Sequence, residues 1–205
     1  KPAPSPATKI DPKKWFDRPV PIGVSTGNEG ECSAGTIGCR VKKGSAVYAL
    51  SNNHVYALEN DAPRGSDVLQ PGLYDSKCVY DVTNVIGTLS DFKNIVFSTD
   101  ANNTIDAAIA LSSTGTLGSA TPSNGYGTPS SEPADAEINQ KVMKYGRTTG
   151  LTNGKVYALN AVVNVAYSSG TARFAGQIII TPGTFSKAGD SGSLIVTSDA
   201  KSPIG

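Results

Sequence analysis

A serine, a histidine and an aspartate of this chain stand in settings that suit covalent chemistry. Ser191 lies in the glycine-rich run 189–193, and the only histidine, His54, lies far upstream. Between them, Asp106 is set in the apolar run 104–110. A serine hydroxyl becomes a nucleophile when a base takes its proton, and an imidazole oriented by a carboxylate is the base suited to neutral pH. The three residues predict a Ser-His-Asp acyl-transfer site.

The turn around Ser191 can also supply hydrogen-bond donors. A glycine two residues before the serine lets the backbone bend sharply. We expect the N–H groups of Gly189 and Ser191 to form an oxyanion hole, in which the loss of one donor costs about 3 kcal/mol of barrier. Asp190 is expected to brace this turn by accepting hydrogen bonds. The simpler alternatives are a surface turn at 189–193, a structural His54 and an Asp106 that caps a turn.

Composition argues against several other classes of function. The 205 residues carry a formal net charge of +1 with only 17% charged residues, and no Lys/Arg cluster stands out, so nucleic acid is not an expected partner. The apolar runs are too short for a membrane-spanning helix, and we expect no membrane association. One histidine and three scattered cysteines lack metal-ligand spacing, so neither metal nor cofactor is expected. The low charge slightly favours an exported protein over a cytoplasmic one.

The three cysteines leave two alternatives open. Cys32 and Cys39 could pair across a hairpin and leave Cys78 free, or all three could stay reduced. The count alone does not decide between them, because it does not report the redox compartment.

Short β-branched runs divided by turn residues predict an all-β chain. Strands are expected at 18–25, 36–41, 45–51, 85–89, 95–97, 105–111, 141–146, 154–159, 161–167, 177–181 and 193–197. A turn-rich stretch with little apolar periodicity divides the chain. The expected parts are a Pro-rich N-terminal arm (1–17), an N-terminal β-barrel (18–112), an inter-barrel linker (113–135) and a C-terminal β-barrel (136–205).

Four segments together carry a resemblance to a known family. The runs 51–55, 104–110 and 188–194 hold His54, Asp106 and Ser191 in that chain order. They resemble the motif blocks of trypsin-like (chymotrypsin-fold) serine peptidases, and 144–156 resembles the opening of the second barrel in bacterial-type members. The resemblance implies two six-stranded antiparallel β-barrels with the site between them. It implies a serine endopeptidase that cleaves protein or peptide substrates through an acyl-enzyme.

Two further expectations rest on this resemblance. In the family, more strands and a helix follow the serine block, so the second barrel is expected to be truncated at its C-terminus, and a cleaved C-terminal fragment of the same protein is an expected partner. Phe185 falls near the base of the specificity pocket. An apolar base disfavours Arg and Lys side chains, which need a carboxylate partner, so small or apolar residues are expected before the cut. The alternative function is an inactive peptidase-like binding or scaffold domain.

Overall fold

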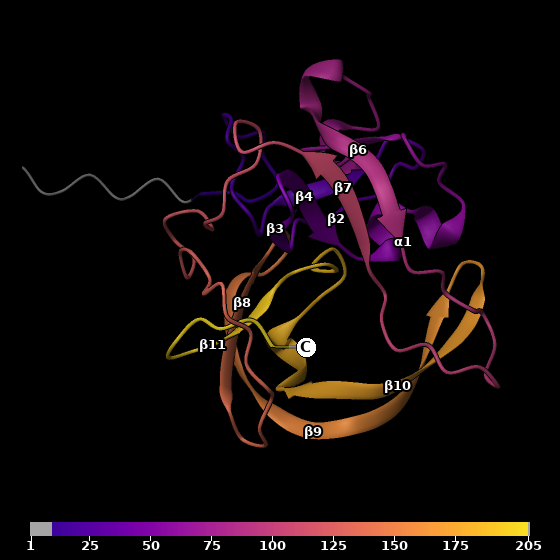
Figure 1. The fold of residues 1–205 in the computed structure, drawn as a ribbon, viewed down its shortest axis with the longest axis vertical. Helices are drawn as coiled ribbons and strands as arrows, with labels where there is room; N and C mark the ends of the chain where they lie inside the picture. Colours follow the sequence, from indigo (N-terminus) through magenta and orange to yellow (C-terminus); the bar gives the residue numbers. More distant parts are fainter. Residues whose placement is uncertain (1–9, 205) are drawn as a thin grey trace, which may run out of the picture.

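The computed structural model describes residues 10–204, which form two curled antiparallel sheets (Figure 1). Within this range the first sheet has seven strands in the order β2-β1-β5-β6-β7-β4-β3, and the second has four in the order β10-β9-β8-β11. The all-β prediction and the two-sheet architecture are confirmed, whereas six strands were expected in each barrel. The prediction for residues 1–9 of the arm lies outside the described residues.

The elements have the following bounds. The first sheet contains β1 (Ser25–Asn28), β2 (Gly35–Thr36), β3 (Cys39–Lys43), β4 (Ala46–Ser51), β5 (Asp67–Leu69), β6 (Val85–Phe92) and β7 (Ala108–Ser112). The second contains β8 (Lys141–Gly146), β9 (Gly150–Tyr167), β10 (Gly170–Thr181) and β11 (Ile195–Thr197). The helical pieces are α1 (Asn53–Tyr56) and the 3-10 turns η1 (Leu58–Asn60), η2 (Leu73–Ser76), η3 (Val82–Asn84) and η4 (Gly183–Phe185). In residues 10–204, no helix has the length and apolar character to cross a membrane.

The first sheet curls around the main apolar core. In β4 every second residue is buried, as expected for a strand with one face on a core. Val20, Ile22 and Leu117 join this core from outside the sheet, and all three are fully buried. Leu117 belongs to the predicted linker, and that segment therefore packs on the first half rather than merely connecting the halves.

The strand predicted at 18–25 is largely wrong, because only Ser25 belongs to β1. Pro19 and Pro21 lack the N–H groups that a sheet ladder needs. The intervening N–H groups of Val20 and Ile22 donate instead to the carbonyls of Thr116 and Ala120, at 2.9 and 3.0 Å. The run 95–97 is likewise predicted as a strand and is found as irregular backbone.

The second sheet is dominated by the long β9–β10 hairpin. In Figure 1 this hairpin runs along the bottom of the view, and its closed end rises toward α1. Two strands were predicted at 154–159 and 161–167, with a break at Asn160. Asn160 does adopt a positive φ of 54°, yet the strand continues through it with a register shift against β10. The paired strands accommodate the positive φ of Asn160 as a β-bulge, so the strand bends there but does not end.

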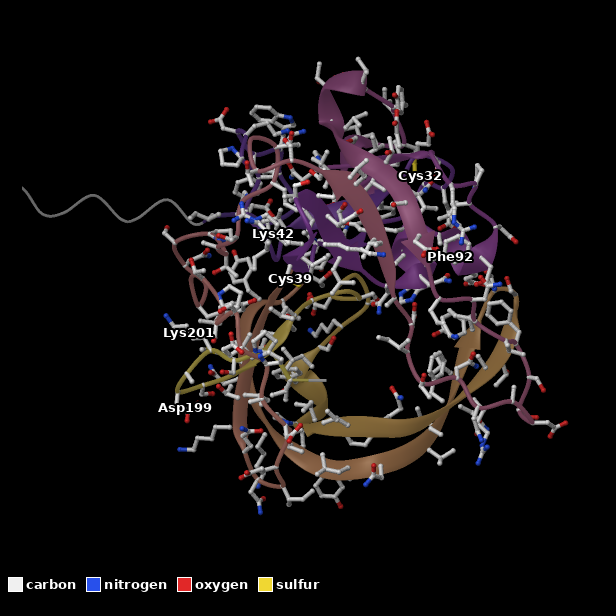
Figure 2. The ribbon with its side chains drawn as sticks, viewed as in Figure 1. Cys32, Cys39, Lys42, Phe92, Asp199 and Lys201 are labelled. Atoms are coloured by element: carbon white, nitrogen blue, oxygen red, sulfur yellow. A yellow bond between two sulfur atoms is a disulfide. The ribbon has the colours of Figure 1, made fainter. Side chains whose placement is uncertain are left out.

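Both alternatives for the cysteines are wrong, because Cys32 is bonded to Cys78 and Cys39 is free. Tyr74 N donates to Ser33 O at 3.2 Å, which holds the loop of Cys32 beside the η2 segment. The resulting Cα–Cα separation of 5.1 Å suits a disulfide. Cys39 lies apart from Cys32 on β3 (Figure 2), and burial raises the pKa of its thiol to about 11.

Candidate active site

His54 and Asp106 form a direct pair on the first half. His54 lies in α1, immediately after β4, and Asp106 lies just before β7. The Nδ1 atom of His54 is 2.5 Å from Asp106 Oδ2, and the His54 N–H donates to Asp106 Oδ1 at 3.3 Å. An ionised carboxylate can only accept, so Nδ1 carries the proton and Nε2 is left to accept one. This is the tautomer that a general base requires.

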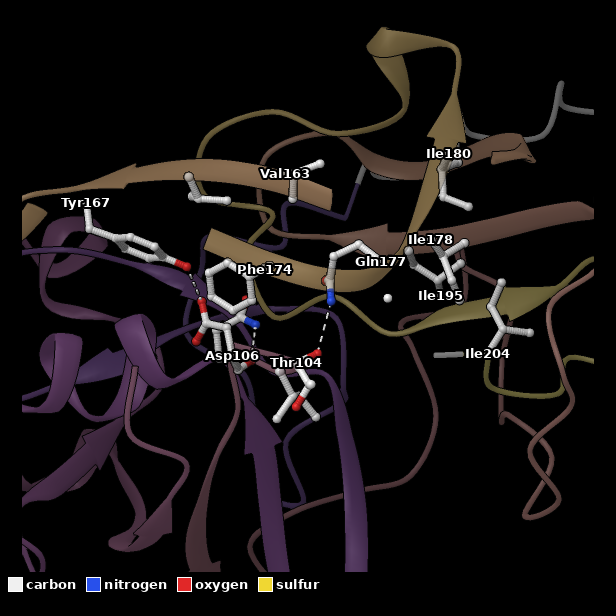
Figure 3. A pocket seen from close by; sticks show the side chains of 14 residues that line it. Thr104, Asp106, Val163, Tyr167, Phe174, Gln177, Ile178, Ile180, Ile195 and Ile204 are labelled. Atoms are coloured by element: carbon white, nitrogen blue, oxygen red, sulfur yellow. Dashed lines mark hydrogen bonds between the residues drawn. The ribbon is translucent and has the colours of Figure 1, made fainter. Parts of the chain in front are cut away.

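The loop that carries Asp106 is held by the second half of the molecule. Asn103 N donates to Arg173 O at 2.9 Å, and Ala175 N donates back to Asn103 O at 2.9 Å. Gln177 Nε2 donates to Thr104 O at 3.0 Å, as the dashed line in Figure 3 shows. From within the first half, Asn52 Nδ2 donates to Asp106 O at 2.6 Å. The backbone around Asp106 is therefore held by strand β10 as well as by Asn52 of the first half.

Tyr167, at the end of β9, completes this part of the site. Its hydroxyl donates to Asp106 Oδ2 at 3.1 Å (Figure 3). Its ring meets the His54 imidazole edge-on, with the ring centroids 5.8 Å apart. The sequence analysis did not single out Tyr167, because nothing local marks a tyrosine on a long strand as a partner of a residue sixty positions away.

Ser191 lies on a sharply bent turn between η4 and β11. The flanking glycines Gly189 and Gly192 both have φ of +90°, a conformation that glycine adopts without strain. Asp190 N donates to Lys187 O at 2.9 Å, and Ser193 N donates to Asp190 O at 3.0 Å. Within residues 10–204, the N–H groups of Gly189 and Ser191 have no protein acceptor. No protein acceptor therefore occupies either of the N–H groups that the sequence analysis expects to form an oxyanion hole.

Asp190 points inward from this turn and is only 3% exposed. It accepts hydrogen bonds from Thr148 N at 2.8 Å, Lys187 N at 3.0 Å and Thr149 Oγ1 at 2.7 Å. Burial alone would raise the pKa of Asp190, but these hydrogen bonds outweigh burial and hold the pKa below its ordinary value. This is the geometry expected of a carboxylate that braces the turn.

The buried charge of Asp190 is paired with Lys144 of β8. Lys144 Nζ is 3.3 Å from Asp190 Oδ2, and the two side chains are 1% and 0% exposed. Burial lowers the pKa of Lys144, and the neighbouring Asp190 opposes that shift. A buried cation and anion of this kind are each costly without the other.

A second buried ion pair holds the serine turn from the first half. Arg147 binds Asp75 of η2 with both arms, Nε to Oδ2 and Nη2 to Oδ1, each at 2.6 Å. The Arg147 N–H donates to Thr36 Oγ1 at 3.1 Å, and Thr36 Oγ1 donates to Gly189 O at 2.9 Å. Arg147 also packs so closely on Gly189 that a Cβ there would lie 2.5 Å from Nη1. Bidentate arginine pairs fix geometry as well as charge.

Gly35 marks where the serine turn meets the helix of His54. Thr36 N donates to Ser191 O at 2.8 Å. A Cβ on Gly35 would lie 2.5 Å from Val55 Cγ2 and 3.0 Å from Ser191 O, so only glycine fits between them. No hydrogen bond joins Ser191 Oγ to His54 Nε2 within residues 10–204. Such contacts are often long before a substrate binds.

Phe185 lines a cavity of about 280 Å³ beside the serine turn, together with Gly192 and Ser193. Its ring is 6% exposed and lies 5.8 Å from Lys144 Nζ. A larger cleft of about 440 Å³ runs from Asp106 and Tyr167 along the second sheet (Figure 3). Its apolar lining is contributed by Ile105, Val163, Val165, Phe174, Ile178, Ile180, Ile195 and Ile204.

Solved structures match this arrangement, although no protein-family model matches the sequence and a search of curated proteins finds no match. A glutamic acid-specific serine protease matches with a TM-score of 0.63 at 22% identity, over 90% of this chain and 82% of that one. NAPase, a Nocardiopsis protease, gives 0.60 at 19% identity, over 90% and 80%. Alpha-lytic protease homologue N4 gives 0.57 at 18% identity, over 91% and 82%.

These matches define the fold of the chain. It has the two-sheet chymotrypsin fold of bacterial serine proteases, as the resemblance of its motif blocks predicts. The likeness is one of backbone architecture, and the roles of individual side chains have to be argued from their own geometry.

Proposed function

We propose that this protein is a serine endopeptidase that uses His54, Asp106 and Ser191 as its catalytic triad. The observation that carries the proposal is the 2.5 Å contact between His54 Nδ1 and Asp106 Oδ2, which leaves Nε2 free to accept a proton. In this mechanism the base removes the proton of Ser191 Oγ, the oxygen attacks the scissile carbonyl, and the proton then passes to the leaving amine. Water repeats the sequence to release the acyl group.

The oxyanion of that reaction is assigned to the N–H groups of Gly189 and Ser191. Neither has a protein acceptor in the described residues, and the buried Asp190 holds the turn that presents them. Donors fixed in advance stabilise the tetrahedral intermediate without reorganising during the reaction.

The substrate proposed is a protein or peptide with a small or apolar residue before the cut. The cavity beside the serine turn is floored by Phe185, and its charged lining residues, Lys144 and Asp190, are already paired with each other. A charged substrate side chain would find no free counter-ion there. One matched structure is described as a glutamic acid-specific serine protease that uses a histidine triad in substrate binding. This chain has a single histidine and therefore has no histidine triad.

The alternative is a peptidase-like binding domain without turnover. What favours it is that no hydrogen bond joins Ser191 Oγ to His54 Nε2 in the described residues. The two functions differ in whether Ser191 reacts.

The test is labelling with a fluorophosphonate probe, followed by intact mass and peptide mapping. We expect one adduct, on Ser191, with a rate that rises with pH as the imidazole becomes neutral. Ser191→Ala should abolish the adduct, whereas the matched control Ser198→Ala, at an exposed serine outside the serine turn and its cavity, should keep it. Folded protein that gains no adduct would rule out the peptidase and leave the binding domain.

A further inference from the structure

The tip of the β9–β10 hairpin reaches across from the second half and touches the His54–Asp106 pair. Tyr167 pairs with Gly170 at the closed end of the hairpin. Its ring packs with Phe97 and Phe174, with centroid separations of 5.6 and 6.3 Å. The hydroxyl emerges from this apolar cluster directly at Asp106 Oδ2. A phenylalanine would fill the same space without the hydrogen bond.

We propose that Tyr167 is a positioning residue that fixes Asp106 through its hydroxyl, and that Asp106 in turn aligns His54. This inference rests on the proposed function for its effect on catalysis. The contacts themselves stand independently of that function. Asp106 Oδ2 receives both His54 Nδ1 and the Tyr167 hydroxyl, at 2.5 and 3.1 Å, so the two donors share one acceptor atom. The hydroxyl stabilises the negative charge on that oxygen, so the carboxylate stabilises a protonated His54 less than it would without the second donor.

The hairpin tip is itself fastened to the first half. Glu59 of η1, just after α1, accepts hydrogen bonds from Ser168 N at 3.1 Å, Ser168 Oγ at 2.9 Å and Ser169 N at 2.7 Å. Burial would raise the pKa of Glu59, but these bonds hold it below its ordinary value. The residues next to Tyr167 are therefore anchored beside the element that carries His54.

The hydroxyl of Tyr167 remains a donor at neutral pH. Burial, and then the charge of Asp106, raise the pKa of Tyr167 above its ordinary value. The charged or titratable groups around the imidazole are Asp106 from the loop before β7, Tyr167 from the hairpin and Glu59 from η1. Asp190 on the serine turn is buried against Lys144.

The single histidine makes the test direct, because every imidazole C–H signal in an NMR pH titration comes from His54. In Tyr167→Phe the carboxylate faces His54 without its second donor and stabilises the imidazolium more strongly. The titration midpoint of His54 should rise by roughly half a unit or more. Asp106 also loses a contact that holds it behind His54, so the imidazole is less well aligned and labelling of Ser191 should slow about ten-fold. The matched control is Tyr157→Phe, the same change on the same strand at a residue that is 68% exposed.

The two readouts separate this inference from the proposed function. A raised midpoint in Tyr167→Phe supports the positioning role even if the wild-type protein never reacts with the probe. Equal midpoints and equal labelling rates in Tyr167→Phe and Tyr157→Phe would overturn it, while labelling of Ser191 would still support a peptidase. If Tyr167→Phe does not fold, Phe97→Leu decides, because it removes a ring that packs on Tyr167 and changes no charge. Loosening Tyr167 in this way should raise the midpoint, and an unchanged midpoint would overturn the role.

Discussion

The two sides of the candidate site are held by different forces. The histidine side (His54, Asp106 and Tyr167) is built from short hydrogen bonds at the edge of a cleft, where His54 is 29% exposed. The serine side (Gly189–Gly192) rests on two ion pairs, Lys144–Asp190 and Arg147–Asp75, that are almost entirely buried. A partly exposed pair can adjust as protons move, whereas buried pairs lock a backbone shape. The contrast suits the proposed function, in which His54 changes its charge while the serine turn keeps its shape.

Asp106→Asn should have the largest effect and should fall on the histidine side alone. An amide facing Nδ1 favours the wrong imidazole tautomer, and the labelling rate of Ser191 should drop by roughly 10⁴-fold. The amide keeps one oxygen that can accept the Tyr167 hydroxyl and leaves no buried charge unpaired, so urea unfolding should change less than in Asp190→Asn. A variant that labels at the wild-type rate would show that the pair plays no part in activating Ser191.

Asp190→Asn should instead act through stability. It leaves the ammonium of Lys144 buried without a counter-charge, although Thr149 Oγ1 and Gly150 O still accept hydrogen bonds from it. Losing the counter-charge costs roughly 3–5 kcal/mol of unfolding free energy. The pKa of Asp190 in the folded state lies below its ordinary value of 3.8. Its contribution is therefore present above that ordinary value and is lost as the pH falls through the folded value. Urea unfolding at pH 7 and below pH 4 should show the variant's deficit shrinking in acid.

The control for that variant is Asp199→Asn, at an exposed aspartate that binds only nearby groups, where little change is expected. An equal loss of stability in the two variants, or a deficit in Asp190→Asn that does not depend on pH, would contradict the buried-pair account.

Gly35→Ala tests whether the two sides must touch. The added Cβ would press on Val55 beside His54 and on Ser191 O, and it should move one side relative to the other. A misplacement of about 1 Å costs on the order of 100-fold in rate, so labelling should slow by about that factor. Gly115→Ala adds a methyl group that meets only Ser113 Oγ, at 3.7 Å, and should label normally. Equal rates for the two variants would mean that the contact at Gly35 tolerates displacement.

The sequence was most informative where the chemistry is local. The turn around Ser191 could be predicted because glycines on either side permit φ of +90°, and strand β8 was placed correctly at Lys141–Gly146. Distant pairings were missed. Asp75 meets Arg147, and Tyr167 meets Asp106, only because parts of the chain that are far apart in sequence pack together, and neither spacing carries a signal. The Cys32–Cys78 bond was missed for the same reason, since it depends on how the loop of Cys32 packs on η2.

That disulfide has a consequence for the serine turn, which lies far from it in the sequence. Cys78 N donates to Leu73 O at 2.7 Å, so the bond fastens the short segment that presents Asp75 to Arg147. A chain made where thiols stay reduced would lack this fastening, and the arm of Arg147 that packs on Gly189 would lose its fixed support. We therefore expect reduction of the Cys32–Cys78 bond to loosen the serine turn without disturbing the contact between His54 and Asp106.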